Sequence, residues 1–338
     1  MQPRLRLITA ALASTVLLTT LAACGKDAEE TPDADPSSSE EPVDASSEPP
    51  PPPALGPLTG LEVTGAAPAH PVLVVKVDNT SSSSPQVGLG SADIVVEELV
   101  EGGMTRLAAF FYTKVPKVVG PVRSMRASDI GIVPTGAHVI TSGAAAITLG
   151  RINKAGIPFV TEGAKGIYRD TSRSAPYNLF SNPDVIGKGI KGGDAPEPYL
   201  EFGSEADFSA KKPARTLSAS FGGHTTTWSY QGGKYVNTNS YAAEGDEFPA
   251  TSVLVLRVAI GDAGYRDPGG YPVPETKFEG TGPAQLFHGG KVLQGTWSKD
   301  GLSGTIKLST KQGDFTVPAG HTWIELVPQN TGNVTWAK

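Results

Sequence analysis

The chain contains a single cysteine, Cys24, and this residue restricts how the rest of the chain can be stabilised. One cysteine cannot form an intramolecular disulfide, and it cannot supply the thiolate cluster of a structural zinc site. The folded part must therefore be held together by an ordinary hydrophobic core. A chain of 338 residues is long enough to build such a core.

The position of Cys24 also indicates where the protein resides. A short basic segment is followed by residues 7–21, which are apolar or small and have the length of a secretory signal rather than of a membrane span. Leu21-Ala22-Ala23 then precedes the cysteine, as small residues do in bacterial lipoproteins. We expect residues 1–23 to be a signal peptide and Cys24 to be lipidated, with palmitate for example, so that the protein is anchored to the outer face of the bacterial cytoplasmic membrane. The alternative is an ordinary signal peptide with an incidental cysteine.

Residues 24–60 have almost nothing to bury. They are rich in Asp, Glu, Ser and Pro, and include five consecutive prolines from Pro49 to Pro53. Low hydrophobicity and like-signed charge predict disorder, and the proline run favours an extended polyproline II conformation. We interpret this segment as a tether between the membrane and the folded part.

The rest of the chain predicts an α/β or α+β domain over residues 61–205, a linker over 206–215 and a mostly antiparallel β domain over 216–338. In the first domain, β-branched apolar runs predict strands and a proline followed by apolar spacing predicts a helix start. The second domain alternates short apolar runs with Gly, Pro and Asp turns, and contains all four tryptophans, which we expect to be core residues. The strands expected in the first domain cover 71–78, 92–100, 104–113 and 138–141, and the helices cover 121–132 and 144–155.

A hairpin is predicted around Gly102-Gly103, because two glycines suit the positive φ angles of a two-residue turn. That turn would pair Leu99 with Arg106. Side chains alternate between the faces of a strand, so Arg106 would share one face with Glu97 and Glu101 and lie within reach of both.

Arg123 and Arg126 are one helical turn apart near the predicted helix start at Pro121, where the helix dipole disfavours cations. An anionic partner is therefore expected nearby. Two interpretations are open: the arginines and the hairpin glutamates neutralise one another in a half-buried network, or the arginines bind a phosphate or carboxylate ligand bidentately. A second polar segment, residues 169–178, adds further arginines and an amide. The candidate anion-binding residues are Arg106, Arg123, Arg126, Arg169, Arg173 and Asn178.

Several short motifs occur in an order that resembles the YerB-like lipoprotein family, which is built on domain of unknown function 3048. The resemblance covers residues 71 to about 182 and, less sharply, the C-terminal β region. It implies a lipid-anchored envelope protein and supplies no reaction. Tyr177 departs from the family pattern, which has histidine there, so we expect no mechanism that needs this histidine as a proton carrier. The motifs are Val77-Asp78-Asn79, Ala92-Asp93-Ile94-Val95, residues 101–106, residues 120–126 and residues 169–173.

The composition and the motifs exclude several classes of function. The formal net charge of −6 disfavours nucleic-acid binding, which needs basic patches. No two histidines have the spacing of a zincin helix, and no nucleophile elbow, Walker loop or dinucleotide fingerprint is present. The sequence indicates no resident cofactor and no particular oligomeric state.

Two hypotheses follow. The protein is an envelope module that binds a cell-wall component, an anionic glycan, a phosphate-bearing ligand or a partner protein through an arginine-rich cleft. Alternatively, it is an envelope enzyme, a phosphotransferase or hydrolase, acting on a phosphate or pyrophosphate substrate, with a divalent cation as its cofactor. The candidates for acid–base chemistry or for holding that cation are Asp78, Asp93, Glu97 and Glu101.

Overall fold

The computed structural model describes residues 54–190, 192 and 195–338. Cys24, the predicted signal peptide and nearly all of the predicted tether lie outside the described residues. Within them, three strands of apolar, mostly β-branched residues form the centre of the fold, β1 (Leu73–Asp78), β2 (Ile94–Leu99) and β3 (Thr105–Phe111), and every residue of the three is buried. Such continuous burial is typical of strands that are covered on both faces.

The elements that follow β3 in the first part of the chain are short. They are α1 (Asp129–Ile132), β4 (His138–Ile140), α2 (Ala146–Lys154), β5 (Phe159–Val160), β6 (Ile167–Arg169), β7 (Leu179–Ser181) and α3 (Pro183–Gly189). None of the helices in the described part of the chain is long and apolar enough to cross a membrane.

The second part of the chain is built almost entirely of strands. These are β8 (Phe202–Gly203), β9 (Lys212–Pro213), β10 (Thr216–Ser220), β11 (Thr225–Gln231), β12 (Lys234–Asn237), β13 (Ser252–Arg266), β14 (Pro272–Lys277), β15 (Gly280–His288), β16 (Lys291–Lys299), β17 (Ile306–Thr310), β18 (Gly313–Phe315), β19 (Val317–Pro318), β20 (Thr322–Pro328) and β21 (Asn333–Ala337). Most of their pairings are antiparallel, and the first part mixes strands with helices, so the predicted fold class is confirmed. The predicted domain boundaries stay a prediction.

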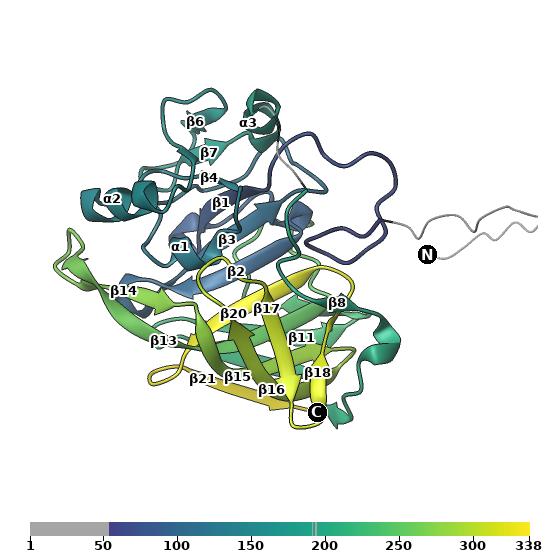
Figure 1. The fold of residues 1–338 in the computed structure, drawn as a ribbon. Coiled ribbons are helices and arrows are strands. Elements are labelled where there is room, and N and C mark those ends of the chain that lie inside the picture. Colours follow the sequence, from purple (N-terminus) through teal and green to yellow (C-terminus); the bar gives the residue numbers. More distant parts are fainter. Residues whose placement is uncertain (1–53, 191, 193–194) are drawn as a thin grey trace, which may run out of the picture. The chain divides into compact units, whose positions relative to one another are not determined.

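One large sheet runs through both parts of the chain (Figure 1). Its main path has the order β18-β17-β16-β15-β13-β20-β2-β3-β1-β4-β5, and β14 and β9 pair with its side. Strand β20 connects the two parts of this sheet, because it pairs in parallel with β2 on one side and with β13 on the other. A second sheet, β12-β11-β10-β21, has four strands.

Each face of the large sheet has its own hydrophobic core. Val75 and Val95 point into a core that also contains Trp228 and Tyr235 of the four-stranded sheet. Val74 and Val96 point into the opposite core, which includes Ile132 of α1. Of the four tryptophans, Trp228, Trp297 and Trp323 are buried, as predicted for core residues, and Trp336 is half-buried.

The predicted helix over 144–155 is confirmed as α2, but the predicted helix over 121–132 is wrong for most of its length. Only α1 at its end is helical. The N–H of Arg123 donates to the carbonyl of Lys76, and the N–H of Met125 donates to that of Gly143. The segment is therefore extended, because its backbone hydrogen bonds go to β1 and to the chain after β4 rather than to itself.

The predicted register of the hairpin is also wrong. The turn has three residues, Glu101–Gly103, and the N–H of Val100 donates to the carbonyl of Met104. Arg106 is therefore opposite Glu98 instead of Leu99. A shift of one residue moves a side chain to the other face of the sheet, so Arg106 lies on the face opposite Glu97.

Candidate functional site

Asp78 is the last residue of β1, and its carboxylate contacts three residues, Thr80, Arg106 and Arg123. Its Oδ1 accepts hydrogen bonds from the N–H and the hydroxyl of Thr80, at 3.0 and 2.5 Å. Its Oδ2 lies 3.0 Å from Nε of Arg123 and 3.8 Å from a guanidinium nitrogen of Arg106. The residue is only 1% exposed, so this carboxylate is saturated by protein groups.

Arg126 has a carboxylate of its own. Its Nε and one terminal nitrogen donate to the two oxygens of Glu101, at 2.6 and 2.8 Å, in the bidentate geometry that guanidinium and carboxylate favour. Burial opposes the ionised form of Glu101, but the hydrogen bonds and charge of Arg126, a backbone hydrogen bond and the charge of Arg106 together lower the pKa of Glu101.

Arg106 and Arg126 meet at Ser124. Both donate to the carbonyl of Ser124, at 3.2 and 3.4 Å, and Arg126 also donates to its hydroxyl at 3.0 Å. Burial, and then the positive charge of Arg126, lower the pKa of Arg106 to about 10, although Asp78 acts in the opposite direction. The guanidinium groups of Arg106 and Arg126 are thus close enough for the charge of one to destabilise the charged form of the other.

Lys76 lies two residues before Asp78 on the same face of β1 and is completely buried. Its ammonium donates to Glu98 at 2.6 Å and to Asp129 at 2.7 Å. Burial opposes the charge on Lys76, but Asp129 and Glu98 together raise its pKa. Burial raises the pKa of Glu98.

The hydrogen bonds at Ser124, and one from the N–H of Arg126 to Asp129, join these ion pairs into one network of four cations and four carboxylates. The charge of this network is unevenly distributed. The sealed end has two carboxylates, Glu98 and Asp129, for Lys76. The other end has three arginines for two carboxylates, Asp78 and Glu101. That end reaches the surface, because the Arg123 side chain is 23% exposed.

The second predicted cluster adjoins this end through Arg123. A terminal nitrogen of Arg123 donates to the carbonyl of Pro176 at 3.2 Å, and its guanidinium lies 5.2 Å from the ring centroid of Tyr177. Arg173 donates to the carbonyl of Ser83 at 3.0 Å and lies over the ring of Phe180. No carboxylate lies within 4 Å of Arg173 in the residues that the structure describes.

Arg169 and Asn178 form a separate, exposed arrangement. Arg169 makes a bidentate ion pair with Glu162, 2.5 Å for each contact, and donates to the side-chain oxygen of Asn178 at 2.8 Å. The sequence does not identify Glu162, because nothing in the spacing of seven residues requires the two to meet.

Asp93 lies at the opposite end of the sheet from Asp78, because β1 and β2 run in the same direction and Asp93 precedes β2. Its carboxylate accepts from the N–H groups of Tyr112 and Thr113 and from the Thr113 hydroxyl. Burial raises the pKa of Asp93, although the bonds from Thr113 and Tyr112 counteract this. Asp93 therefore connects β2 to the end of β3 and has no access to the arginines.

Glu97 belongs to a different buried cluster, on the other face of the sheet. It accepts from Thr226 at 2.9 Å and from Asn79 at 3.1 Å, and His224 lies 3.5 Å away. Its neighbour on β20 is Glu325, which also accepts from the indole N–H of Trp228 at 2.9 Å. Sequence reasoning missed Glu325, whose only local signal is a charge within the apolar run of β20.

The geometry also bears on the enzyme hypothesis. Ser252 Oγ lies 2.9 Å from Nδ1 of His288, whose Nε2 lies 2.5 Å from Glu205. Ser252 is completely buried, so a substrate cannot reach its hydroxyl. In the part of the chain that the structure describes, no three His, Cys, Asp or Glu side chains gather in a way that would hold a metal ion.

Three comparisons relate the chain to known proteins. Residues 58–195 match the N-terminal domain, and residues 216–324 the C-terminal domain, of the family described as "Protein of unknown function (DUF3048)". "Putative lipoprotein YerB" of Bacillus subtilis (strain 168) is 27% identical in an alignment of 301 positions, which covers 80% of this chain and 86% of the relative. The crystal structure of the YerB protein from Bacillus subtilis matches with a TM-score of 0.70 and 22% identity, over 83% of this chain and 99% of that one. Both halves of the chain thus match in order, and the chain belongs to the DUF3048 family.

Proposed function

We propose that this protein is a lipid-anchored component of the bacterial envelope and that it binds an anionic ligand beside Arg123 and Arg173. The observation that carries the proposal is the charge distribution of the buried network. Arg106, Arg123 and Arg126 gather around Ser124 and Asp78, with one carboxylate fewer than there are guanidinium groups. The network as a whole has as many carboxylates as cations, but its surplus carboxylate lies at the sealed end beside Lys76. A ligand with a phosphate or carboxylate group would add negative charge at the surface end.

Arg123 is the group through which the ligand would be bound. Of the three arginines it is the most exposed, at 23% of its side chain, against 6% for Arg106 and 12% for Arg126. Its position is fixed on three sides by Asp78, the Pro176 carbonyl and the ring of Tyr177. A fixed guanidinium loses little conformational entropy when it binds.

Arg173 would be the second residue that contacts the ligand. It contacts Ser83, at the end of the loop that begins at Asp78, so the two arginines flank the same short loop. Its guanidinium contacts the carbonyl of Ser83 and the ring of Phe180, and in the described residues the carboxylate that it influences, Asp170, makes no ion pair with it within 4 Å. Arg126 is held by Glu101 and Arg169 by Glu162, so we assign neither of them a contact with the ligand.

The membrane part of the proposal is supported by the lipoprotein name of the relative from Bacillus subtilis and by the sequence around Cys24. A protein tethered in this way is exposed to the phosphate-bearing and carboxylate-bearing polymers of the cell wall. We therefore expect the ligand to be an anionic glycan or a phosphate-containing wall component.

Calorimetric titration of the full chain with inorganic phosphate and with pyrophosphate tests the anion site. We expect pyrophosphate to bind more tightly, and Arg123→Ala to weaken its binding by a factor of at least about ten, since a hydrogen bond to a charged group contributes about 1.5–3 kcal/mol. Arg169→Ala is the matched control and should leave the affinity unchanged. Equal affinity of the wild type and Arg123→Ala, or no binding of either anion, would sink the proposal.

A further inference from the structure

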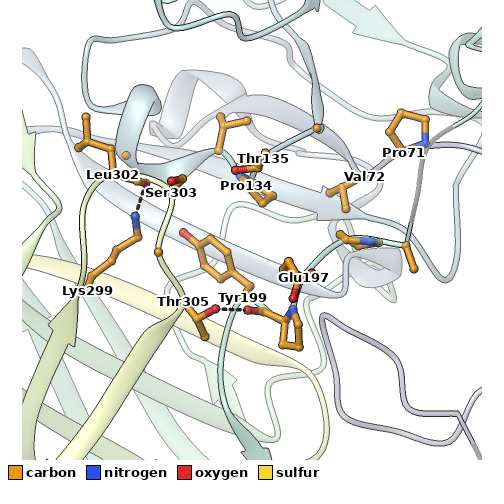
Figure 2. Close-up of a pocket in the computed structure, with 17 residues that line it drawn as sticks. Pro71, Val72, Pro134, Thr135, Glu197, Tyr199, Lys299, Leu302, Ser303 and Thr305 are labelled. Atoms are coloured by element: carbon orange, nitrogen blue, oxygen red, sulfur yellow. Dashed lines mark hydrogen bonds between the residues drawn. The ribbon is translucent and has the colours of Figure 1, made fainter.

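Figure 2 shows a cavity of about 310 Å³ by volume, and no arginine of the described residues lines it. Its walls come from four separate stretches of chain: residues 71–72 before β1, residues 131–136 at the end of α1 and after it, residues 195–199, and residues 299–305 at the end of β16 and after it. Figure 2 shows Tyr199 in the middle of the lining, with Lys299 on one side and Glu197 on the other.

The one buried charged side chain of this lining is Lys299, of which only 3% is exposed. Its ammonium donates to the carbonyls of Gly301, at 3.2 Å, and Leu302, and it lies 5.4 Å from the ring centroid of Phe278. In the described chain no carboxylate lies within 4 Å of it. Burial lowers the pKa of Lys299 to about 8, and the more distant Glu279 counteracts this only in part.

A second buried lysine, Lys76, can be compared with Lys299. Lys76 is sealed inside the protein and has two carboxylates in contact. Lys299 contacts no carboxylate of the described residues, and unlike Lys76 it lines a cavity. A buried ammonium without a counter-ion is unfavourable, and fixed charges of this kind are usually paired.

We propose that this cavity binds a small organic molecule whose carboxylate accepts a hydrogen bond from the ammonium of Lys299. The rest of the lining suits an apolar body, because it includes Val72, Val133, Leu302 and several prolines. The exposed carboxylate of Glu197 on the same lining would repel a doubly charged phosphate more strongly than a singly charged carboxylate. A cavity of about 150 Å³ is enough for benzene, so this one has room for a ring and its carboxylate.

The test is a thermal-shift experiment on the full chain at pH 7 with benzoate, cyclohexanecarboxylate and butyrate at millimolar concentration. The uncharged amide of each acid is measured separately for comparison. At least one carboxylate should raise the melting temperature by about 2–4 °C, and its amide should not. Lys299→Met should abolish the shift. Lys307→Met, on the neighbouring strand and 65% exposed, should keep it.

A direct measurement covers the case in which Lys299→Met does not fold. Lysines of the wild-type protein are reductively methylated with ¹³C and titrated by NMR, with and without the carboxylate that gave the largest shift. Bound carboxylate should raise the pKa of Lys299 by at least one unit, because it stabilises the charged amine. The site does not exist if no carboxylate changes the melting temperature, if each amide acts as strongly as its acid, or if the Lys299 resonance does not respond. Arg123→Ala should retain the response, which separates this site from the anion site proposed above.

Discussion

Glu97 and Glu325 are direct neighbours on the parallel strands β2 and β20, and neither has any exposed surface. Two buried carboxylates side by side cannot both be ionised without strong repulsion. Burial, and then the charge of Glu97, raise the pKa of Glu325 well above its ordinary value. Glu97 has the donors that a carboxylate needs, from Thr226 and Asn79, and Glu325 therefore keeps the proton.

This pair predicts an unusual dependence of stability on pH. Between the ordinary pKa of a glutamate, about 4.3, and the raised value in the protein, the folded chain holds a proton that the unfolded chain has released. The Glu325 contribution to the unfolding free energy therefore falls by about 1.4 kcal/mol for each pH unit in that window. Glu325→Gln imitates the protonated form, so its stability relative to the wild type should rise as the pH increases from 4 to 8.

Urea unfolding of both proteins at several pH values measures this difference. The control is Glu244→Gln, at an exposed position, whose unfolding free energy should differ from that of the wild type by the same amount at every pH. Parallel curves for Glu325→Gln and the wild type would show that Glu325 titrates normally.

Lys76→Met should be among the most destabilising single substitutions in the chain. It leaves Glu98 and Asp129 buried without their cation, and breaking a buried ion pair in this way costs about 3–5 kcal/mol. The comparison is Lys188→Met, which removes an exposed pair with Asp184 on α3 and should cost about 0.5 kcal/mol or less. Chemical denaturation decides the prediction, which is wrong if the two losses are similar.

The turn between β2 and β3 offers a matched pair of glycines. Gly102 and Gly103 both have positive φ, at 68° and 72°. A Cβ on Gly102 would meet no atom within 4 Å, whereas a Cβ on Gly103 would lie 2.6 Å from the backbone nitrogen of Gly223. Gly102→Ala should therefore cost only the backbone strain, about 1–2 kcal/mol. Gly103→Ala should cost clearly more, because the backbone at Gly223 must also move, and equal melting temperatures would contradict this.

The lipid anchor predicted from the sequence is tested at Cys24. Cys24→Ala should abolish incorporation of labelled palmitate and release the protein from the membrane fraction, because without acyl chains nothing else is predicted to hold it there. Immunoblots of the membrane and culture fractions measure the outcome. A wild-type protein that incorporates no palmitate and appears in the culture fraction, as the variant does, would point to the alternative interpretation of the leader.

The sequence predicted the central strands well, since continuous β-branched runs have few alternatives to a buried strand. It failed where long-range pairing competes with local preference. Pro121 and the apolar spacing after it favour a helix, but β1 offers Arg123 and its neighbours backbone partners that no local pattern reveals. Two adjacent glycines fit a turn of two residues or of three, and the wrong choice placed Arg106 on the wrong face.

For the candidate site, the motifs identified the arginines but only some of their partners. The hairpin prediction placed Glu101 within reach of Arg106. The structure pairs it with Arg126, as the interpretation in which hairpin glutamates and arginines neutralise one another allows. Lys76, the one charge within the apolar run of β1, could have indicated a buried ion pair, but Asp129 lies 53 positions further along the chain. Glu325 is more distant still, and only the three-dimensional fold brings it to Glu97.

The place of β20 between β2 and β13 has a consequence for biogenesis. β2 is among the first strands to leave the ribosome and β20 is nearly the last, so the edge of β2 stays without its neighbour while almost all of the protein is synthesised. An uncovered strand edge readily pairs with another chain. Completion of the large sheet therefore has to wait until β20 has been synthesised, and a product truncated before β20 would carry an unpaired edge that readily aggregates.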